Sequence, residues 1–499
     1  MPVIDRPVTR ALEQAIADHG AGHGAVRFGD LTWTLGELLD VSGRVACGLR
    51  HLGVGAGDRV AVYATNVPEH VFVMLACARL GAIYTGVNPQ WSAPEVAFLV
   101  RDAGIRVLFV NGATVGTASE VCEVAPGIVE HLVPVDGPAM AALMSQADAG
   151  PYFADPDSPV ALWYTSGSSG RPKGALWSHR SFLYNGLAWM EQYGIGSTDR
   201  CVAAFPIAHN SLGVCIASIL SGAELVIEPG FDPGRLIQTI QRLGVTMMPT
   251  SPSMISILRT RARVQGVSEL PSMRTMPVGT GPSTADFRDS FRAFFPNARI
   301  YNCYGASEGI FSLYKPDDPA GKRGSVGRPL PGVTMRVVDD QGRPLGTGEI
   351  GRLEASGPGN MLYYWGRPEA TADVLHHGWL TVGDLGYIDA DGYVWIVSRD
   401  SDVINSGGFN VYASEVERVI AAVPGVRAVA VLGEPDEVLG ERVAAIIEAA
   451  AGSGLAAADI EAACVRGLAR YKRPAVIRFV SELAVDDMGK VRKHLLHRS

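Results

Sequence analysis

The chain has 499 residues, of which 47% are hydrophobic and 19% are charged. At roughly 100 to 200 residues per domain, this length predicts about three folding units, or one large body with a smaller one, and it excludes a lone small module. Lys and Arg number 43 and Asp and Glu number 51, so the net charge is −8 without a basic stripe, which argues against nucleic acid or an anionic membrane as the main partner.

Apolar, β-rich runs alternate with helix-like segments in the first part of the chain. Strands are expected at residues 59–64, in the run that ends at Val110, at 224–228 and at 245–249, and the apolar spacing of residues 69–80 predicts a helix. Such alternation indicates parallel or mixed sheets covered by helices.

Residues 201–223 contain no Asp, Glu, Lys or Arg and are long enough to cross a bilayer. A membrane span is nevertheless not expected, because Pro206, His209 and Asn210 would place a helix breaker and polar groups within the hydrocarbon. A buried segment beside a functional site fits this stretch better.

The seven cysteines form no CxxC pair and lie mostly among apolar neighbours, which predicts free thiols in a reducing compartment. The first residues, MPVIDRPVTRALEQ, lack the basic-then-apolar layout of a signal peptide. We therefore expect a cytoplasmic protein.

The pattern of apolar and turn residues changes twice in the last third of the sequence. After Arg328, apolar runs separated by Gln-Gly and Asp-Gly turns predict hairpins of a small antiparallel β unit. Near residue 400 a second change begins, and a capping box at 414–417 followed by helical spacing predicts a helix before a strand. The expected fold is α/β: an N-terminal body, residues 1–400, of α/β sheets plus a small β-barrel-like unit, and a smaller α+β C-terminal domain, residues 401–499.

The segment at 164–174, YTSGSSGRPKG, directly follows an apolar strand and is the strongest local signal for chemistry. Its hydroxyls, glycines, Arg171 and Lys173 can surround a polyphosphate with N–H groups, hydroxyls and cations. It is not a Walker A loop, because the Gly-Lys-Ser/Thr end with its earlier glycine is missing.

The segment GASEG at 305–309 fits the GxSxG pattern of a nucleophile elbow, and a plausible strand precedes it. Asp384 and His494 supply later members of a triad. A serine hydrolase that uses Ser307 is therefore an alternative from another class of enzyme.

Taken together, the motifs resemble those of the adenylate-forming superfamily of acyl-CoA synthetases, luciferases and nonribosomal adenylation domains, in particular the carboxylate–CoA ligases. The resemblance covers nearly the whole chain, and it rests on six segments that occur in the family's order: 164–174, FPIAHN at 205–210, NCYGASEG at 302–309, GWLTVGDLGYID at 378–389, SRDSDVINSGGFNVYASEVE at 398–417 and MGKVRK at 488–493.

The resemblance implies an AMP-forming acid–thiol ligase. A carboxylic acid would react with ATP to give acyl-AMP and pyrophosphate, and CoA would then displace AMP. The substrates implied are the acid, ATP and CoA, with Mg²⁺ as the metal, and the smaller domain is expected to rotate between the two steps.

The resemblance also implies roles for individual residues. Lys490 would bridge the carboxylate and the phosphate, His209 would lie beside the acyl carbonyl, and Glu308 would bind Mg²⁺. The ATP- and AMP-binding positions are Thr165, Ser166, Gly167, Ser168, Ser169, Gly170, Lys173, Tyr304 (adenine), Gly305, Ser307 (α-phosphate), Asp384 (ribose) and Arg399. The acid pocket is expected around Trp189, His209, Gly279, Thr280, Gly281, Asn302, Cys303 and Ala306, the CoA tunnel at Gly407 and Gly408, and the hinge at Ser401.

Two departures from the family pattern leave the second step open. Ser401 stands where the family usually has Asp or Lys, and Val382 replaces a common Thr. An amide synthetase, with an amine as acceptor, and an enzyme that loads a carrier protein therefore remain alternatives to the CoA ligase. The sequence suits an aryl and a medium-chain acid equally and favours a monoacid; a monomer and a homodimer both remain open.

Overall fold

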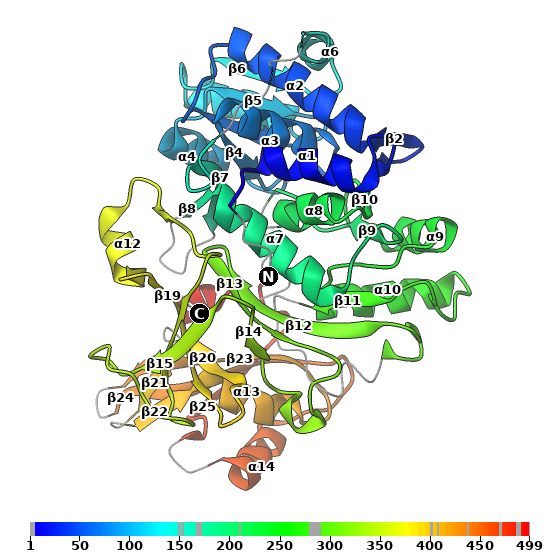
Figure 1. The fold of residues 1–499 in the computed structure, drawn as a ribbon. Coiled ribbons are helices and arrows are strands. Elements are labelled where there is room, and N and C mark those ends of the chain that lie inside the picture. Colours follow the sequence, from blue (N-terminus) through cyan, green and yellow to red (C-terminus); the bar gives the residue numbers. More distant parts are fainter. Residues whose placement is uncertain are drawn as a thin grey trace.

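Figure 1 shows the computed structural model of the chain. It describes residues 5–147, 150, 154–165, 172–208, 211–278, 291–399, 403–406, 409–436, 439–468, 472–485 and 491–498. The expected α/β body and the smaller α+β unit are both present, with the smaller unit at the foot of the view in Figure 1.

A seven-stranded sheet forms the first layer of the body. Its order is β17 (Tyr363–Tyr364), β8 (Lys173–Ser178), β7 (Pro159–Thr165), β4 (Ile83–Val87), β3 (Arg59–Tyr63), β5 (Val107–Val110) and β6 (His131–Pro134). The strands from β7 to β6 pair in parallel, whereas β8 is antiparallel to β7 and β17 to β8. Continuous apolar runs suit these positions, because helices cover both faces of a parallel sheet.

Helices pack on both faces of this sheet, and one of them, α3, is buried on all of its faces. They are α1 (Val8–His19), α2 (Leu35–His51), α3 (Glu69–Leu80), α4 (Ala93–Ala103), α5 (Val115–Val124) and α6 (Pro138–Met144). The predicted helix at 69–80 is thus confirmed, and its residues from His70 to Leu80 are all buried. Helix α3 contacts α1, α2 and α8 (Ser211–Leu220), so it joins the first layer to the second.

The second layer consists of two four-stranded sheets. One has the order β2 (Leu31–Thr34), β1 (Gly24–Phe28), β10 (Glu224–Ile227), β9 (Arg200–Ala203), and the other β11 (Thr275–Val278), β12 (Arg299–Ala306), β13 (Gly309–Tyr314), β14 (Arg328–Pro329). Their helices are α7 (His179–Tyr193), α8, α9 (Pro233–Leu243) and α10 (Pro252–Val264). Residues 245–249, expected to be a strand, contribute isolated bridges instead, through which Met247 links Cys201 of β9 to Thr275 of β11.

The small β unit that was expected after Arg328 is a five-stranded antiparallel sheet. It contains β15 (Thr334–Val338), β16 (Gly351–Ser356), β18 (Leu375–His376), β19 (Trp379–Ile388) and β20 (Val394–Arg399), and helix α12 (Pro368–Val374) lies between β17 and β18. The Asp391-Gly392 turn joins β19 to β20 as the sequence predicts. Strand β20 leads directly into the C-terminal unit.

The C-terminal unit is a five-stranded sheet with helices. Its strands are β21 (Val403–Ser406), β22 (Phe409–Tyr412), β23 (Val426–Asp436), β24 (Gly440–Ala449) and β25 (Val476–Val480), and its helices are α13 (Ala413–Ala421) and α14 (Ala457–Gly467). The predicted capping box is wrong, because α13 begins at Ala413, two residues earlier than expected, with Tyr412 at the N-cap position. The Ser414 hydroxyl donates instead to the Val397 carbonyl, and the Glu417 carboxylate accepts from Val431 N at 2.8 Å.

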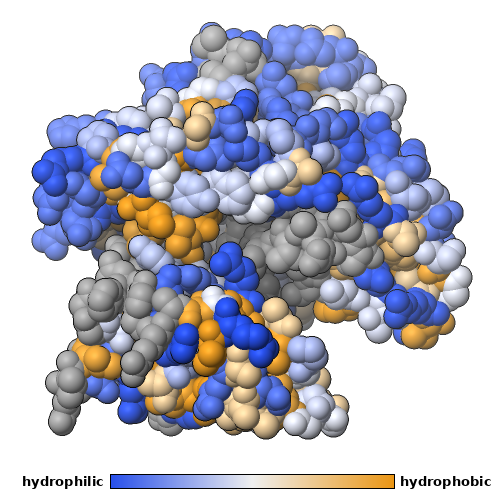
Figure 2. All heavy atoms as spheres, turned by 90° about the horizontal axis from the view of Figure 1, so that it is seen from below, coloured by the Kyte–Doolittle hydropathy of each residue, from blue (hydrophilic) through white to orange (hydrophobic). Residues whose placement is uncertain are grey.

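On the face of the molecule shown in Figure 2, hydrophilic residues surround smaller hydrophobic patches. Among the described residues, no helix is both long and apolar enough to cross a membrane. The uncharged stretch from Cys201 instead forms β9, a loop and α8 within the body, and most of its described residues are buried.

Candidate functional site

The motif NCYGASEG lies on the β12–β13 hairpin. Tyr304, on β12, is 7% exposed, and its hydroxyl donates to the Asp384 carboxylate at 2.7 Å. Asp384 belongs to β19, where it is paired with Arg399 of β20. Two motifs that are 80 residues apart therefore meet through one buried hydrogen bond, next to the strand pair that holds Arg399.

The turn between β12 and β13 contains the GxSxG pattern. Ser307 and Glu308 form this turn, and Ala306 pairs with Gly309 across it. A Cβ at Gly305 would lie 2.9 Å from the Gly309 carbonyl oxygen, which explains the glycine. A nucleophile elbow requires a strand followed by a helix, whereas here a strand follows a strand.

The hydrolase alternative fails at its second residue as well. Asp384 accepts a hydrogen bond from Tyr304, so this carboxylate faces a phenol on the neighbouring hairpin. The side chain of His494 lies outside the described part of the chain. The structure therefore gives no support to a hydrolase triad at Ser307.

Glu308 is held by a tyrosine that the sequence analysis missed. The Tyr364 hydroxyl donates to Glu308 Oε1 at 2.6 Å, and Met361 N donates to the Glu308 carbonyl at 2.8 Å. Lys173 Nζ lies 5.1 Å from the centre of the Tyr364 ring, a cation–π distance. Burial, together with the nearby Glu308 carboxylate, raises the pKa of Tyr364, so the phenol stays protonated and acts as the donor.

The Ser/Gly-rich segment is the connection of the β7–β8 hairpin. Thr165 and Lys173 form the last cross-strand pair before it, and residues 166–171 of the connection lie outside the described part of the chain. Trp365 N donates to the Gly174 carbonyl at 2.7 Å, and β17 pairs with β8. Lys173 and Glu308 are thus brought to the same short segment, 361–365.

Tyr164, the first residue of that motif, anchors the hairpin. Its hydroxyl donates to Asp102 at 2.7 Å, and Arg367 forms an ion pair with the same carboxylate. Burial, followed by the hydrogen bond to Asp102, raises the pKa of Tyr164. Tyr164 therefore ties the end of β7 to Asp102 and, through it, to Arg367.

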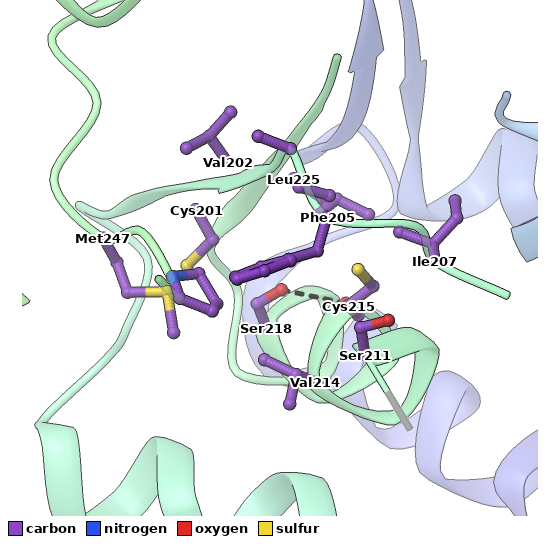
Figure 3. Close-up of a pocket in the computed structure, with 13 residues that line it drawn as sticks. Cys201, Val202, Phe205, Ile207, Ser211, Val214, Cys215, Ser218, Leu225 and Met247 are labelled. Atoms are coloured by element: carbon purple, nitrogen blue, oxygen red, sulfur yellow. Dashed lines mark hydrogen bonds between the residues drawn. The ribbon is translucent and has the colours of Figure 1, made fainter. Parts of the chain in front are cut away.

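A cavity of about 20 Å³, enough for about one water molecule, lies beside the loop that carries FPIAHN. Figure 3 shows the ring of Phe205 at its centre, with sulfur atoms from Cys201, Cys215 and Met247 around it. The lining residues are Cys201, Val202, Ala203, Ala204, Phe205, Ile207, Ser211, Val214, Cys215, Ser218, Leu225, Met247 and Pro249. No Asp, Glu, Lys, Arg or His is among these described residues.

The two hydroxyls in this lining are occupied locally. Ser211 Oγ donates to the Pro206 carbonyl at 2.6 Å, and Ser218 Oγ donates to the Cys215 carbonyl at 2.8 Å, the bond dashed in Figure 3. The residues around the cavity therefore form an apolar, sulfur-rich wall.

Other residues that were expected near the acid have partners elsewhere. Asn302 donates to the Ser325 carbonyl at 3.2 Å, and the Cys303 thiol lies 2.8 Å from the Tyr193 hydroxyl. Trp189 packs against Tyr193 with ring centroids 6.5 Å apart. Burial raises the pKa of Cys303 to about 12, so this thiol is not a nucleophile.

Several predicted site residues fall outside the described part of the chain, namely Ser166, Gly167, Ser168, Ser169, Gly170, His209, Gly279, Thr280, Gly281, Ser401, Gly407, Gly408 and Lys490. For Thr165 and Arg399 the structure describes the backbone but not the side chain. Within the described residues the structure brings together Lys173, Glu308 and Tyr364 on one side, and Tyr304, Asp384 and Arg399 on the other.

The sequence analysis indicated a role for neither Tyr364 nor Met247. Tyr364 stands in the segment MLYYWG, whose aromatic composition fits a buried core equally well. Met247 was assigned to an ordinary strand. Neither position carries a local signal, because each acquires its role from a contact with a distant segment.

Comparison with known proteins gives one consistent result. A sequence model described as "AMP-binding enzyme" matches residues 12–365, and its C-terminal domain matches residues 415–490. Feruloyl-CoA synthase from Amycolatopsis sp is 35% identical over 95% of both chains, and indoleacetate–CoA ligase from Aromatoleum aromaticum is 32% identical over 95% of this chain and 94% of the other. ATP-bound MatB from Rhodopseudomonas palustris is 28% identical, with a TM-score of 0.88 and 98% of each chain covered.

Proposed function

The chain belongs to the family of AMP-binding enzymes, and we propose that it is an ATP-dependent carboxylate–CoA ligase that activates an apolar, aryl monoacid. The observation that carries this proposal is the hairpin β12–β13. Tyr304 and Asp384 meet on its β12 side, and Glu308, Tyr364 and Lys173 meet at its turn. One short element thus lies near the carboxylate that we assign to the ribose and near the lysine and glutamate that we assign to the phosphates and their metal ion.

In the first step a carboxylate oxygen of the acid attacks the α-phosphorus of ATP. The bond from this phosphorus to the bridging oxygen breaks, and pyrophosphate leaves. Both reactants are anions, so the site must supply positive charge and fixed donors where they meet. Lys173 supplies charge on the pyrophosphate side, and Lys490 is assigned to the forming bond. Asp384 accepts from the ribose hydroxyls and so orients the nucleotide.

In the second step the sulfur of CoA attacks the acyl carbonyl carbon. The bond between this carbon and the phosphate oxygen breaks, AMP leaves, and the thiol proton passes to solvent. The arm of CoA must approach through a narrow passage, for which Gly407 and Gly408 are the assigned residues because glycine permits close backbone approach. Ser401 is the assigned hinge for the rotation of residues 401–499 between the two steps.

Glu308 is the residue that we assign to Mg²⁺. Among the described residues no group of three or more His, Cys, Asp or Glu forms a metal cage. A single carboxylate nevertheless fits Mg²⁺, which proteins often hold by one or two carboxylates together with substrate phosphates. When bound, the ion would neutralise charge on the phosphates. Tyr364 holds the Glu308 carboxylate in place by its hydrogen bond of 2.6 Å.

The cavity itself holds only about one water molecule, so we take its lining, and not its volume, as one wall of the acyl site, and this wall supports an uncharged acyl group. A second carboxylate would find no cationic partner among the described lining residues, whose two hydroxyls already donate to backbone carbonyls. Burying such a group unpaired costs about 1 to 3 kcal/mol or more. Two of the relatives are named for aryl acids, which favours an aryl over an aliphatic group.

The acid can be identified by a screen for pyrophosphate release with aryl, aliphatic and dicarboxylic acids. We expect release with an apolar aryl monoacid and none with a dicarboxylic acid. Products formed from the best acid should then be identified by mass with CoA, with amines and with a carrier protein as acceptors. Thioester formation with CoA supports the proposal, whereas an amide or a loaded carrier protein without acyl-CoA would replace it.

The role of Lys490 can be tested by separating the two steps. Lys490→Ala is expected to abolish ATP–pyrophosphate exchange and to retain thioester formation from preformed acyl-AMP. Lys493→Ala is the matched control, because Lys493 is three residues away and forms an ion pair with Glu417 at 2.8 Å. Exchange that survives in Lys490→Ala would overturn the assignment.

The cytoplasm is the compartment that we propose. All seven cysteines are free in the structure, and burial raises the pKa of Cys215 to about 12. Such thiols persist without pairing in a reducing environment.

A further inference from the structure

Asn66 lies in the loop between β3 and α3 and is 3% exposed. Its side chain contacts the loop that follows β9, although the two loops are about 140 residues apart. Asn66 Nδ2 donates to the Phe205 carbonyl at 2.7 Å and approaches the Ala203 carbonyl at 3.5 Å, and Asn66 Oδ1 accepts from Ile207 N at 2.9 Å. The amide thus satisfies two main-chain groups of one loop and approaches a third at the end of β9.

The loop 204–208 needs such a partner because it is irregular and largely buried. Buried backbone N–H and C=O groups outside helices and strands must find side chains or water. A side-chain amide is the group that suits this loop, since it offers two donors and an acceptor in one plane. The main chain of Asn66 adds a contact to a third strand end, donating from N to the Pro229 carbonyl at 3.2 Å.

The loop also contacts β4. A Cβ at Gly86 would lie 2.2 Å from the Ala208 carbonyl oxygen, so the strand and the loop are in direct backbone contact. The loop is therefore held by Asn66 and packed against Gly86. Phe205 and Ile207, whose main chain Asn66 binds, both line the cavity assigned to the acyl group.

We propose that Asn66 is a positioning residue for the acyl pocket: by clamping the main chain from Phe205 to Ile207, it sets the wall of the cavity without touching the acid. This inference rests on the proposed function, because it takes the apolar lining of the cavity beside residues 205–210 as one wall of the acyl site. Reaction geometry is sensitive to displacements of about 1 Å, so release of this loop alters acid binding and the approach of the carboxylate.

The test uses two conservative substitutions of Asn66 in the full chain. Asn66→Asp keeps the shape and the acceptor but loses the donor to Phe205, and Asn66→Gln keeps the amide but moves it by one methylene. Thr114→Val is the matched control, because Thr114 is 1% exposed and its hydroxyl donates to the Tyr63 carbonyl near the same edge of the sheet. KM and kcat for the acid and for ATP are measured by pyrophosphate exchange, together with thermal unfolding.

We expect Asn66→Asp to raise the acid KM by at least tenfold while the ATP KM changes by less than threefold. Asn66→Gln is expected to give a smaller change in the same direction, and Thr114→Val to lower the unfolding temperature without changing the acid KM. Equal changes in both KM values, no change in either, or loss of folding in both Asn66 variants alone would overturn the inference. If the wild-type chain activates no acid, the proposed function fails instead.

Discussion

The two halves of the proposed site are built in opposite ways. On the nucleotide side, polar side chains from distant strands meet in pairs, as in Tyr304 with Asp384 and Tyr364 with Glu308. On the acyl side, the described lining is apolar and sulfur-rich, and its hydroxyls bond to nearby backbone carbonyls. The polar contacts of that side are made outside the lining, where the Asn66 side chain forms hydrogen bonds with the main chain of Phe205 and Ile207.

Because of this difference, the two halves constrain their ligands to different degrees. A hydrogen bond has a fixed direction and length, so the nucleotide side specifies one ligand closely. Apolar contact is not directional and depends mainly on area and fit. The acyl side can therefore change its acid by changing side-chain volume, whereas the nucleotide side has little room for change.

The largest effect is expected at Glu308. Glu308→Gln keeps the size of the side chain and removes its charge, so adenylation should slow by about 100- to 1000-fold, the scale for loss of one electrostatic group in an active site. Pyrophosphate exchange measured over a range of Mg²⁺ concentrations checks this. Glu349→Gln, in an exposed turn, is the control. A change of less than threefold for Glu308→Gln would remove Glu308 from the site.

Asp384 should give the next largest effect. Asp384→Asn weakens the acceptor for the ribose hydroxyls, and hydrogen bonds to charged groups contribute about 1.5 to 3 kcal/mol, so the ATP KM should rise about 10- to 100-fold. The acid KM should remain unchanged. Asp391→Asn, in the turn of the same β19–β20 hairpin, is the control. A rise in the acid KM alone would contradict the division of the site.

On the acyl side, a change in side-chain volume should alter the selectivity for the acid and not the binding of the nucleotide. Met247→Val widens the cavity, so kcat/KM for a bulkier aryl acid should rise about tenfold relative to a smaller one. Met248→Val is a close control, because Met248 is equally buried but packs into the neighbouring core of α9 and α10. Parallel effects in both variants would show that general loosening, rather than the cavity, is responsible.

The last effect concerns stability and pH, and not catalysis. Burial raises the pKa of Glu69, at the start of α3, to about 7 from its ordinary 4.5, and Asp136 adds to the rise. The folded state therefore binds the proton more tightly than the unfolded state, and the wild type loses stability as pH rises from about 4.5 to 7. Glu69→Gln removes this loss, so its advantage over the wild type should grow by on the order of 2 to 3 kcal/mol across that range. Unfolding measured by denaturant at pH 5 and pH 8 checks it, and a constant difference would contradict it.

The sequence predicted the large-scale organisation well, because it depends on local patterns. The helix from Glu69 to Leu80, the strands at 59–64 and 224–228 and the Asp391-Gly392 hairpin all follow from periodicity and turn residues. The capping box at Ser414 and the strand at 245–249 were wrong, because contacts with Val397 and with two neighbouring strands decided the local structure there.

The contacts between distant segments could not be predicted. Nothing near Tyr364 in the sequence indicates that its hydroxyl reaches Glu308, and nothing near Asn66 indicates that its amide holds Phe205 and Ile207. Such pairs arise only when the sheets are packed. The GxSxG pattern at Ser307 shows the reverse case, in which a local pattern suggested chemistry that its strand-turn-strand setting excludes.

The central claim, that the acid passes through an acyl-AMP on its way to CoA, is tested most directly by labelling the acid with ¹⁸O in both carboxylate oxygens. Attack of the carboxylate on the α-phosphorus predicts that one labelled oxygen appears in AMP and one stays in the acyl-CoA at each turnover. Unlabelled AMP, or the formation of ADP and phosphate in its place, would contradict the account.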